Sequence, residues 1–140
     1  MRRSPAPPLD CNQNRYTQVV GAPEEKLGIR AAFLLPSLKL KGMSASGATF
    51  EHEVHKFLID SFDGYTAAAG NLFGYWKDRQ GNDSYGEHRQ FTVALMDDSK
   101  LPRLKDYLSD LAQRLDEECI YLETGQTIAL IYSPSAQPPE

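Results

Sequence analysis

The sequence contains few features that identify an activity directly. Its 140 residues include two cysteines, Cys11 and Cys119, which lack the Cys-x-x-Cys spacing typical of zinc and redox sites. No apolar run reaches the length of a membrane-spanning helix, and the basic start "MRR" is not followed by the apolar stretch of a secretory signal. We therefore predict reduced thiols, no membrane association and a cytoplasmic location.

Basic residues are too few and too scattered for a nucleic-acid-binding surface. The formal net charge is −4, and the only dense basic spot is Arg2-Arg3. Affinity for a phosphate backbone comes from clustered Lys and Arg, which this chain lacks. RNA-recognition motifs stack bases on sheet aromatics, but their basic, glycine and aromatic pattern is also missing. The sequence predicts no nucleic-acid partner.

Motifs for nucleotide, calcium and hydrolytic chemistry are absent as well. The stretch "GNLFG" lacks the lysine of a phosphate-binding loop, and "GMSASG" carries Ser46 where a nucleophile elbow requires glycine. Placing Gly81 at the sixth position of a calcium loop puts Trp76 at the first, where an oxygen ligand is needed. We predict no cofactor and assign no catalytic residue from a motif.

Two histidines, His52 and His55, lie one helical turn apart in "EHEVH". Such a pair can chelate a divalent cation, but a functional site needs further ligands, and His88 is the only other histidine. The spacing also differs from that of the H-E-x-x-H motif. A solvated helix face is therefore favoured, and we predict no metal site.

Composition predicts one folded domain between two tails. The chain is 41% hydrophobic and 24% charged, which is typical of a soluble globular protein. Residues 1–25 are rich in Pro, Ser, Asn and Gln, and residues 133–140 are similar, so neither segment can bury enough apolar surface to offset the entropy of ordering. We expect disordered tails at 1–25 and 133–140 and a single domain at 26–132.

Alternating apolar residues predict a strand followed by two hairpins. "GIRAAFLLP" alternates until its proline ends the run. "YTAAAGNLFGYW" and "RQFTVALMD" are expected to pair, with residues 77–87 at the tip and bends at Gly70 and Gly74. "CIYLE" and "QTIALIY" are expected to form the second hairpin around the turn Thr124-Gly125.

The stretch "TFEHEVHKFLIDSFDG" predicts the first helix. Its apolar residues fall at helical spacing, Thr49 is a suitable N-cap, and Gly64 stands where a left-handed residue can end the helix.

A second helix is predicted over "SKLPRLKDYLSDLAQRLDEE". Its leucines recur at alternating steps of three and four, and Ser99 is a suitable N-cap. Arg114 is spaced for i, i+4 ion pairs with Asp110 and Glu118. The leucine stripe is shorter than the heptads of a coiled coil, which favours a helix packed on a sheet.

The element order predicts an α+β fold of the ferredoxin-like type. The order is β-α-β-β-α-β with an additional C-terminal strand, and two right-handed crossovers place both helices on one face of an antiparallel sheet. The other face is left without a helix. A large exposed apolar surface is a liability, so we expect a homo-oligomer, dimer or trimer, or a ligand to cover it.

With this layout, the segment from Ile29 to Tyr132 resembles PII signal proteins, including the extra strand after the core and "FDGYT" after the first helix. The resemblance implies an oligomer whose loop between the second and third strands contacts partner proteins. That loop, 77–87, is short here, and the glycine-rich phosphate segment is replaced by "LDEECIY", so no nucleotide site is carried over. The chain also resembles bacterial proteins of unknown function with "GGYT…GxW…DG"-like patterns.

The flanks of the central hairpin are the best candidates for a ligand-binding site. Tyr75, Trp76, His88 and Phe91 lie where two adjacent strands leave the turn, and Tyr and Trp are enriched at interfaces. The main functional expectation is a non-catalytic, regulatory module that binds a small molecule or a protein through these residues and the open sheet face.

The alternative expectation is a small enzyme of the dimeric α+β barrel type. It would use Tyr75, Trp76, His88 or Glu87 in a mostly apolar pocket between the sheet and the helices.

Overall fold

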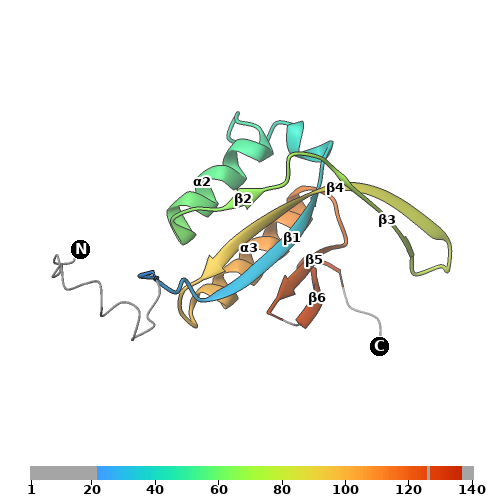
Figure 1. Cartoon of the computed structure of the whole chain (residues 1–140). Helices are drawn as coiled ribbons and strands as arrows, with labels where there is room; N and C mark the ends of the chain where they lie inside the picture. The colour runs from blue at the N-terminus through green and yellow to red at the C-terminus, as the bar shows by residue number, and fades with distance from the viewer. Residues whose placement is uncertain (1–21, 126, 137–140) are drawn as a thin grey trace, which may run out of the picture.

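The computed structural model describes residues 22–125 and 127–136 of the chain, and these form one sheet with two α-helices packed against it (Figure 1). The elements follow in this order: β1 (Ile29–Pro36), the short 3-10 helix η1 (Lys39–Lys41), α2 (Phe50–Phe62), β2 (Thr66–Ala67), β3 (Leu72–Lys77), β4 (Asp83–Leu95), α3 (Lys100–Arg114), β5 (Cys119–Thr124) and β6 (Thr127–Tyr132).

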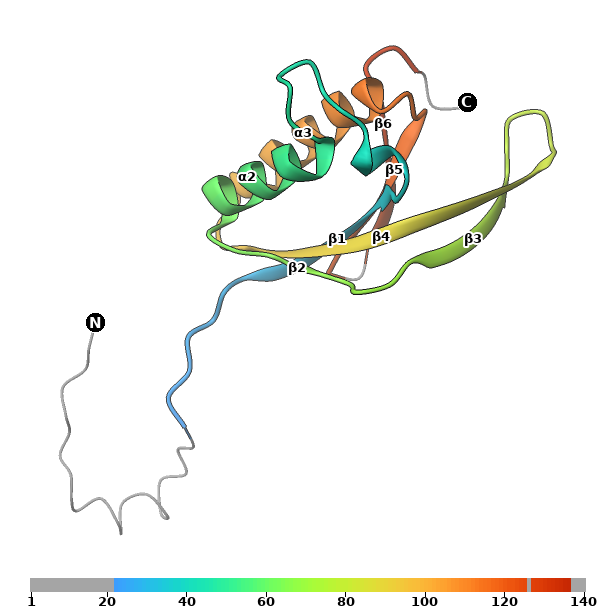
Figure 2. The same ribbon diagram turned by 90° about the horizontal axis from the view of Figure 1, so that it is seen from above.

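The order of the strands in space confirms the predicted architecture. The path across the sheet is β2-β4-β1-β5-β6, and β3 pairs with β4 next to β2. Each of these pairings is antiparallel. Figure 2 shows α2 and α3 side by side on one face of the sheet. The described part of the chain is therefore an α+β fold of the ferredoxin-like type, with β6 as the additional strand.

The core lies between the sheet and the two helices. On β1 and β4 the odd-numbered residues from Ala31 to Leu35 and from Phe91 to Leu95 point toward the helices and are buried. The rings of Phe33 and Phe91 stack with centroids 5.7 Å apart. The leucine stripe of α3 is buried on the same layer, so the prediction of a helix packed on a sheet is confirmed.

The helix ends confirm one predicted cap and correct two. Thr49 caps α2, because its hydroxyl oxygen accepts a hydrogen bond from the His52 amide at 3.1 Å. The left-handed residue after α2 is Asp63 and not Gly64, which was the expected one. Ser99 makes no side-chain capping bond; instead Asp97 accepts hydrogen bonds from the Ser99 amide and hydroxyl.

The hairpin of β3 and β4 forms an arm that extends away from the helices (Figure 2). Its turn, residues 78–82, is shorter than predicted, because β3 and β4 stay paired up to Lys77 and Asp83. The Asp78 carboxylate closes this turn by accepting bonds from the Gln80 and Asn82 amides, each 2.9 Å long. The bend expected at Gly70 is present between β2 and β3, but Gly74 continues in regular pairing.

The expected tails lie mostly outside the described residues. Residues 1–21 and 137–140 of the two predicted tails belong to that part, and residues 22–25 are exposed. Among the helices that the structure describes, none has the length and apolar character needed to cross a membrane.

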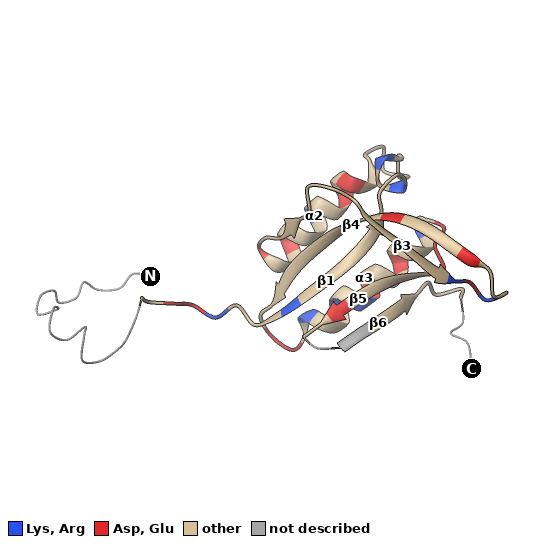
Figure 3. Cartoon of the chain, turned by 45° about the vertical axis from the view of Figure 1, so that its right-hand side comes forward, with Lys and Arg blue, Asp and Glu red and all other residues tan. Residues whose placement is uncertain are grey.

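Charged residues gather on the helices, the loops and the arm, with few on the central strands (Figure 3).

The ion pairs of Arg114 differ in part from those predicted. Its predicted pair with Asp110 is present at 2.9 Å, but the predicted pair with Glu118 is wrong. Glu118 lies 2.5 Å from Arg79 at the tip of the arm, and Arg114 instead reaches Glu53 on α2 at 2.9 Å.

Glu53 is the centre of a small polar cluster that ties the loop before α2 to both helices. Ser44 and Ser46 donate hydrogen bonds to the same carboxylate oxygen, and Arg114 donates to the other. These hydrogen bonds, first of all from the two serines, lower the pKa of Glu53 from 4.5 to about 2. The stretch "GMSASG" therefore serves as an anchored loop.

We predict a pH-dependent loss of stability through this carboxylate. Its folded-state pKa is depressed, so its contribution is complete above pH 4.5 and is lost as the pH falls toward 2. At pH 7, Glu53→Gln should lower the free energy of unfolding by roughly 1 kcal/mol, allowing for solvent screening.

Urea unfolding at pH 7, 5 and 3 measures the difference in free energy of unfolding between wild type and Glu53→Gln. This difference should be smaller at pH 3 than at pH 7. As a control, Asp60→Asn changes an exposed residue on the same helix and should leave the free energy of unfolding nearly unchanged. An equal difference at all three pH values would contradict the lowered pKa of Glu53.

Candidate functional site

The four predicted ligand-binding residues lie on two different faces of the sheet. Trp76 and His88 share one face, because β3 and β4 pair Leu72 with His88 and Trp76 with Ser84. Tyr75 and Phe91 point to the opposite face. Phe91 is 2% exposed and belongs to the core, so it does not join the other three at the surface. The ligand-binding role of the other three stays a prediction.

Trp76 lies across a pair of facing glycines on the arm. Gly74 and Gly86 are direct partners in the β3 and β4 register. A Cβ atom at Gly86 would stand 2.7 Å from Cη2 of Trp76 and 2.6 Å from Cε1 of His88, and a Cβ at Gly74 would stand 3.3 Å from the indole. The two glycines therefore let the indole ring lie flat on the strands.

His88 packs beside this indole, with ring centroids 5.6 Å apart. Burial lowers the pKa of His88 below its usual 6.5, and the nearby Glu117 acts in the opposite direction with a smaller effect. The imidazole is therefore neutral at pH 7 and can both donate and accept a hydrogen bond.

Tyr75 belongs to an exposed aromatic group on the other side of the arm. Its side chain is 74% exposed, and its ring lies 5.1 Å from that of Tyr85, which in turn stacks on Phe73 at 6.2 Å. No helix of the described chain covers this part of the arm in Figure 2.

The histidine pair on α2 gains no further metal ligand. The rings of His52 and His55 are 6.3 Å apart, and Nδ1 of His55 lies 2.8 Å from the Tyr65 hydroxyl. Glu51 is engaged by Arg89 at 2.7 Å. Within residues 22–125 and 127–136, no group of three or more His, Cys, Asp or Glu residues is placed to hold a metal ion.

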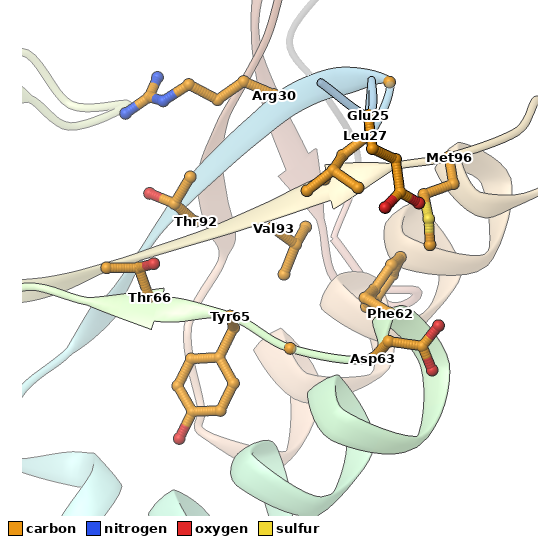
Figure 4. Close-up of a pocket in the computed structure, with 13 residues that line it drawn as sticks. Glu25, Leu27, Arg30, Phe62, Asp63, Tyr65, Thr66, Thr92, Val93 and Met96 are labelled. Carbon is orange, nitrogen blue, oxygen red and sulfur yellow. The ribbon is translucent and has the colours of Figure 1, made fainter. Parts of the chain in front are cut away.

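A mostly apolar cavity of about 570 Å³ opens at the edge of the sheet, where the chain passes from α2 into β2 (Figure 4). Its lining comes from the segment before β1, the end of α2, β2 and the end of β4: Glu25, Leu27, Gly28, Arg30, Phe62, Asp63, Gly64, Tyr65, Thr66, Thr92, Val93, Ala94 and Met96. This volume is in the range that small-molecule sites occupy.

Figure 4 shows how the side chains around the apolar part of this cavity lie. Leu27, Met96 and Glu25 lie on one side, Phe62 and Asp63 on the other, and Val93 between them. The Arg30 side chain points away from this group, and its guanidinium is 3.9 Å from Glu123.

Gly28 is the sequence signal that marks this cavity. Its φ is +97°, and a Cβ atom there would stand 1.9 Å from the Leu95 carbonyl oxygen. Only glycine allows the chain to cross the end of β4 so closely, and this crossing carries Glu25 and Leu27 over the cavity. A glycine before a strand is too common for sequence reasoning alone to have identified it.

A second, wider cavity of about 810 Å³ lies next to the first and shares Gly28 and Met96 with it. It faces the start of α3 and is bordered by three carboxylates, Asp97, Asp98 and Asp106. Neither cavity includes any of the predicted site residues on the arm.

No protein-family profile matches the sequence, and no curated protein matches it either. Among solved structures, the chain is similar to a phage SAM lyase in complex with S-methyl-5'-thioadenosine. The TM-score is 0.52 with 10% sequence identity, over 84% of this chain and 99% of the lyase. The apo form of a phage SAM lyase gives a TM-score of 0.49 with 13% identity, over 83% of this chain and 100% of the lyase.

At this level of identity the likeness concerns the fold, and it corrects the main functional expectation. A non-catalytic module was predicted because catalytic motifs are missing, yet the solved structure that shares nearly its whole length with this chain is that of an enzyme. The absence of a catalytic motif was a weak basis for that expectation, because a reaction within one bound molecule does not require such a motif. The alternative expectation, a small enzyme, agrees better with the comparison.

The position of Trp76 can be tested with its own fluorescence, because it is the only tryptophan in the chain. Gly86→Ala should push the indole off the strands and shift its emission to longer wavelength, since the added Cβ would overlap the ring. Gly70→Ala is the matched control, because a Cβ there meets no atom within 4 Å. Equal spectra for the two variants would show that the indole does not lie on Gly86.

Proposed function

We propose that this protein is a small enzyme that cleaves an adenosyl sulfonium compound of the S-adenosylmethionine type and releases S-methyl-5'-thioadenosine. The observation that carries the proposal is the match in fold to a phage SAM lyase over 99% of that chain, with a TM-score of 0.52. The cavity at the edge of the sheet is the proposed active site, because it is mostly apolar and large enough for a small molecule.

The proposed reaction breaks the bond between the sulfonium sulfur and the four-carbon amino-acid chain. The electron pair of that bond returns to sulfur, which becomes a neutral thioether. The carboxylate of the same substrate supplies the electron pair that replaces it on carbon, and the chain closes to a lactone. Atoms and charge balance without water, a metal ion or a proton transfer.

An apolar lining favours this chemistry. The substrate begins with a separate positive sulfur and a negative carboxylate, and both charges diminish in the transition state. A reaction that disperses charge is assisted when water is removed from the reacting groups. Phe62 and Val93 are buried at the cavity, and Leu27 and Met96 border it, so these side chains are suited to exclude water there.

The proposed mechanism agrees with the missing motifs. An intramolecular displacement requires that the substrate be folded with its carboxylate near the carbon under attack, and orientation alone accelerates such reactions strongly. It does not require a nucleophilic side chain or a general base. The residues proposed to orient the substrate are Thr66 and Thr92, whose hydroxyl groups border the cavity. The Tyr65 ring points toward α2, where its hydroxyl lies 2.8 Å from Nδ1 of His55.

The expected homo-oligomer remains part of the proposal. Phe73, Tyr75 and Tyr85 form an exposed aromatic group on the arm, a kind of surface that often meets another subunit. The relationship to PII proteins and the cytoplasmic location also stay predictions.

Light scattering during size-exclusion chromatography checks the oligomer. We expect a mass above the 15.7 kDa of one chain. Tyr75→Asp should reduce this mass, whereas Met43→Asp, an equally exposed apolar position away from the arm, should not. A wild-type protein that elutes as a monomer would contradict the oligomer without touching the proposed reaction.

The activity is tested by incubating the purified protein with S-adenosylmethionine and separating the products by liquid chromatography with mass detection. S-Methyl-5'-thioadenosine should form in proportion to enzyme concentration, faster than in a boiled sample. Val93→Asp, which places a charge in the apolar lining, should lower the rate at least tenfold. Circular dichroism shows whether that variant is folded. Product formation no faster than in the boiled sample would refute the proposed function.

A further inference from the structure

Asp63 occupies a backbone position that suits glycine better. It ends α2 with φ +65° and ψ +5°, the left-handed conformation in which a Cβ atom is crowded. A glycine follows immediately, yet Gly64 does not take this position. Aspartate is among the side chains that tolerate the conformation best, but it still costs conformational free energy that glycine would avoid.

The charge of Asp63 is also unfavourable where it stands. The carboxyl end of a helix carries a partial negative charge, and a carboxylate there is repelled by it. The last turn of α2 contains no basic residue, and Asp60 adds a second negative charge. Lys100 of α3 donates a hydrogen bond to the Ser61 carbonyl at 2.7 Å, so a cation does compensate the helix end. None of the ion pairs in the described chain involves Asp63 itself.

Asp63 also borders the cavity. Its side chain is exposed at the rim next to Phe62, and Glu25 stands across from it, beside Met96 (Figure 4). These are the two carboxylates of the lining, and Arg30, its one cation, points away and pairs with Glu123. The apolar cavity thus has a rim of negative charge.

We propose that Asp63 gives the cavity its preference for a positively charged sulfonium substrate over the corresponding neutral thioether. The inference rests on the proposed function and adds to it the residue that determines specificity. A cation bound beside Asp63 would offset the repulsion between its carboxylate and the end of α2, whereas the cost of the left-handed backbone stays the same with or without ligand. A strained residue at the border of a cavity is where such a role is expected.

The direction of the kinetic effect follows from the charge on sulfur. The sulfonium is fully charged in the bound substrate and loses its charge as the bond to carbon breaks. A carboxylate at the rim therefore stabilises the bound substrate more than the transition state. Replacing it should raise KM and leave kcat unchanged or slightly higher. A merely structural role would lower kcat instead.

Binding can be measured without turnover by using two adenosyl amino acids that are not cleaved. In sinefungin a carbon replaces the sulfonium sulfur and carries an ammonium group in place of the methyl group, whereas S-adenosylhomocysteine has a neutral thioether sulfur. Both share the adenosine and amino-acid parts, so the two ligands differ only at the position of the sulfonium group. Isothermal titration calorimetry with wild type, Asp63→Asn and Asp60→Asn gives the affinities. Asparagine tolerates the left-handed conformation, and the Asp60 variant changes net charge equally outside the cavity lining.

We expect wild type to bind sinefungin more tightly than S-adenosylhomocysteine. Asp63→Asn should weaken sinefungin binding by about threefold, the magnitude of an ion pair at an exposed position, and leave S-adenosylhomocysteine unchanged. Asp60→Asn should change neither. The inference is overturned if Asp63→Asn weakens both ligands equally, if it changes neither, or if wild type binds neither ligand.

Failure of the inference is distinguishable from failure of the proposed function. If S-adenosylmethionine is bound but not cleaved while Asp63→Asn lowers only sinefungin affinity, the charge preference stands and the lyase activity is refuted. If S-methyl-5'-thioadenosine is released and Asp63→Asn alters neither ligand, the activity stands and the role of Asp63 is refuted.

Discussion

The antiparallel pairing of β1 with β4 is the constraint on which the rest of the structure depends. It runs without interruption from Ile29 opposite Leu95 to Pro36 opposite His88. Because strands have a period of two, this register places Phe33 and Phe91 together under the helices and makes their stacking the centre of the core. A shift of either strand by one residue would turn the ring of that strand to the open face. The two ends of the same pair carry the two surfaces of functional interest, the cavity at one end and the arm at the other.

The arm and the cavity are suited to different kinds of binding. The arm presents aromatic rings on a two-stranded ribbon, and its glycine pair holds Trp76 flat against the strands. Such a surface is suited to contact with another surface or a planar molecule. The cavity combines an apolar interior with a carboxylate rim, and it is formed by four segments that the fold brings together. A reaction that consumes charge within one substrate molecule needs such an interior and little else. The proposed reaction therefore does not depend on a catalytic motif in the sequence.

Most of the fold was predictable because its determinants are local. Alternation in "GIRAAFLLP" and the leucine spacing of α3 depend only on which residues face the core, and both were confirmed. Boundaries were less certain, because competing hydrogen bonds decide them: Asp97 binds the amide and hydroxyl of Ser99, and Asp63 takes the left-handed position that was assigned to Gly64. The candidate site was not predictable to the same degree. Phe91 alternates into the core, and the cavity contains none of the residues singled out on the arm.

The sequence by itself determined the element types, their order and hence the α+β architecture, since periodicity of apolar residues and turn chemistry are properties of short segments. The tertiary structure alone decided where functional groups meet. Arg114 reaches Glu53 across 61 positions in the sequence, and Gly28 crosses the end of β4 so that Glu25 comes to lie over the same cavity as Asp63. These encounters depend on strand register and helix packing over distances that no local pattern encodes. The left-handed turn at Asp63 is local, but the role proposed for its charge is not, because that role depends on the cavity beside it.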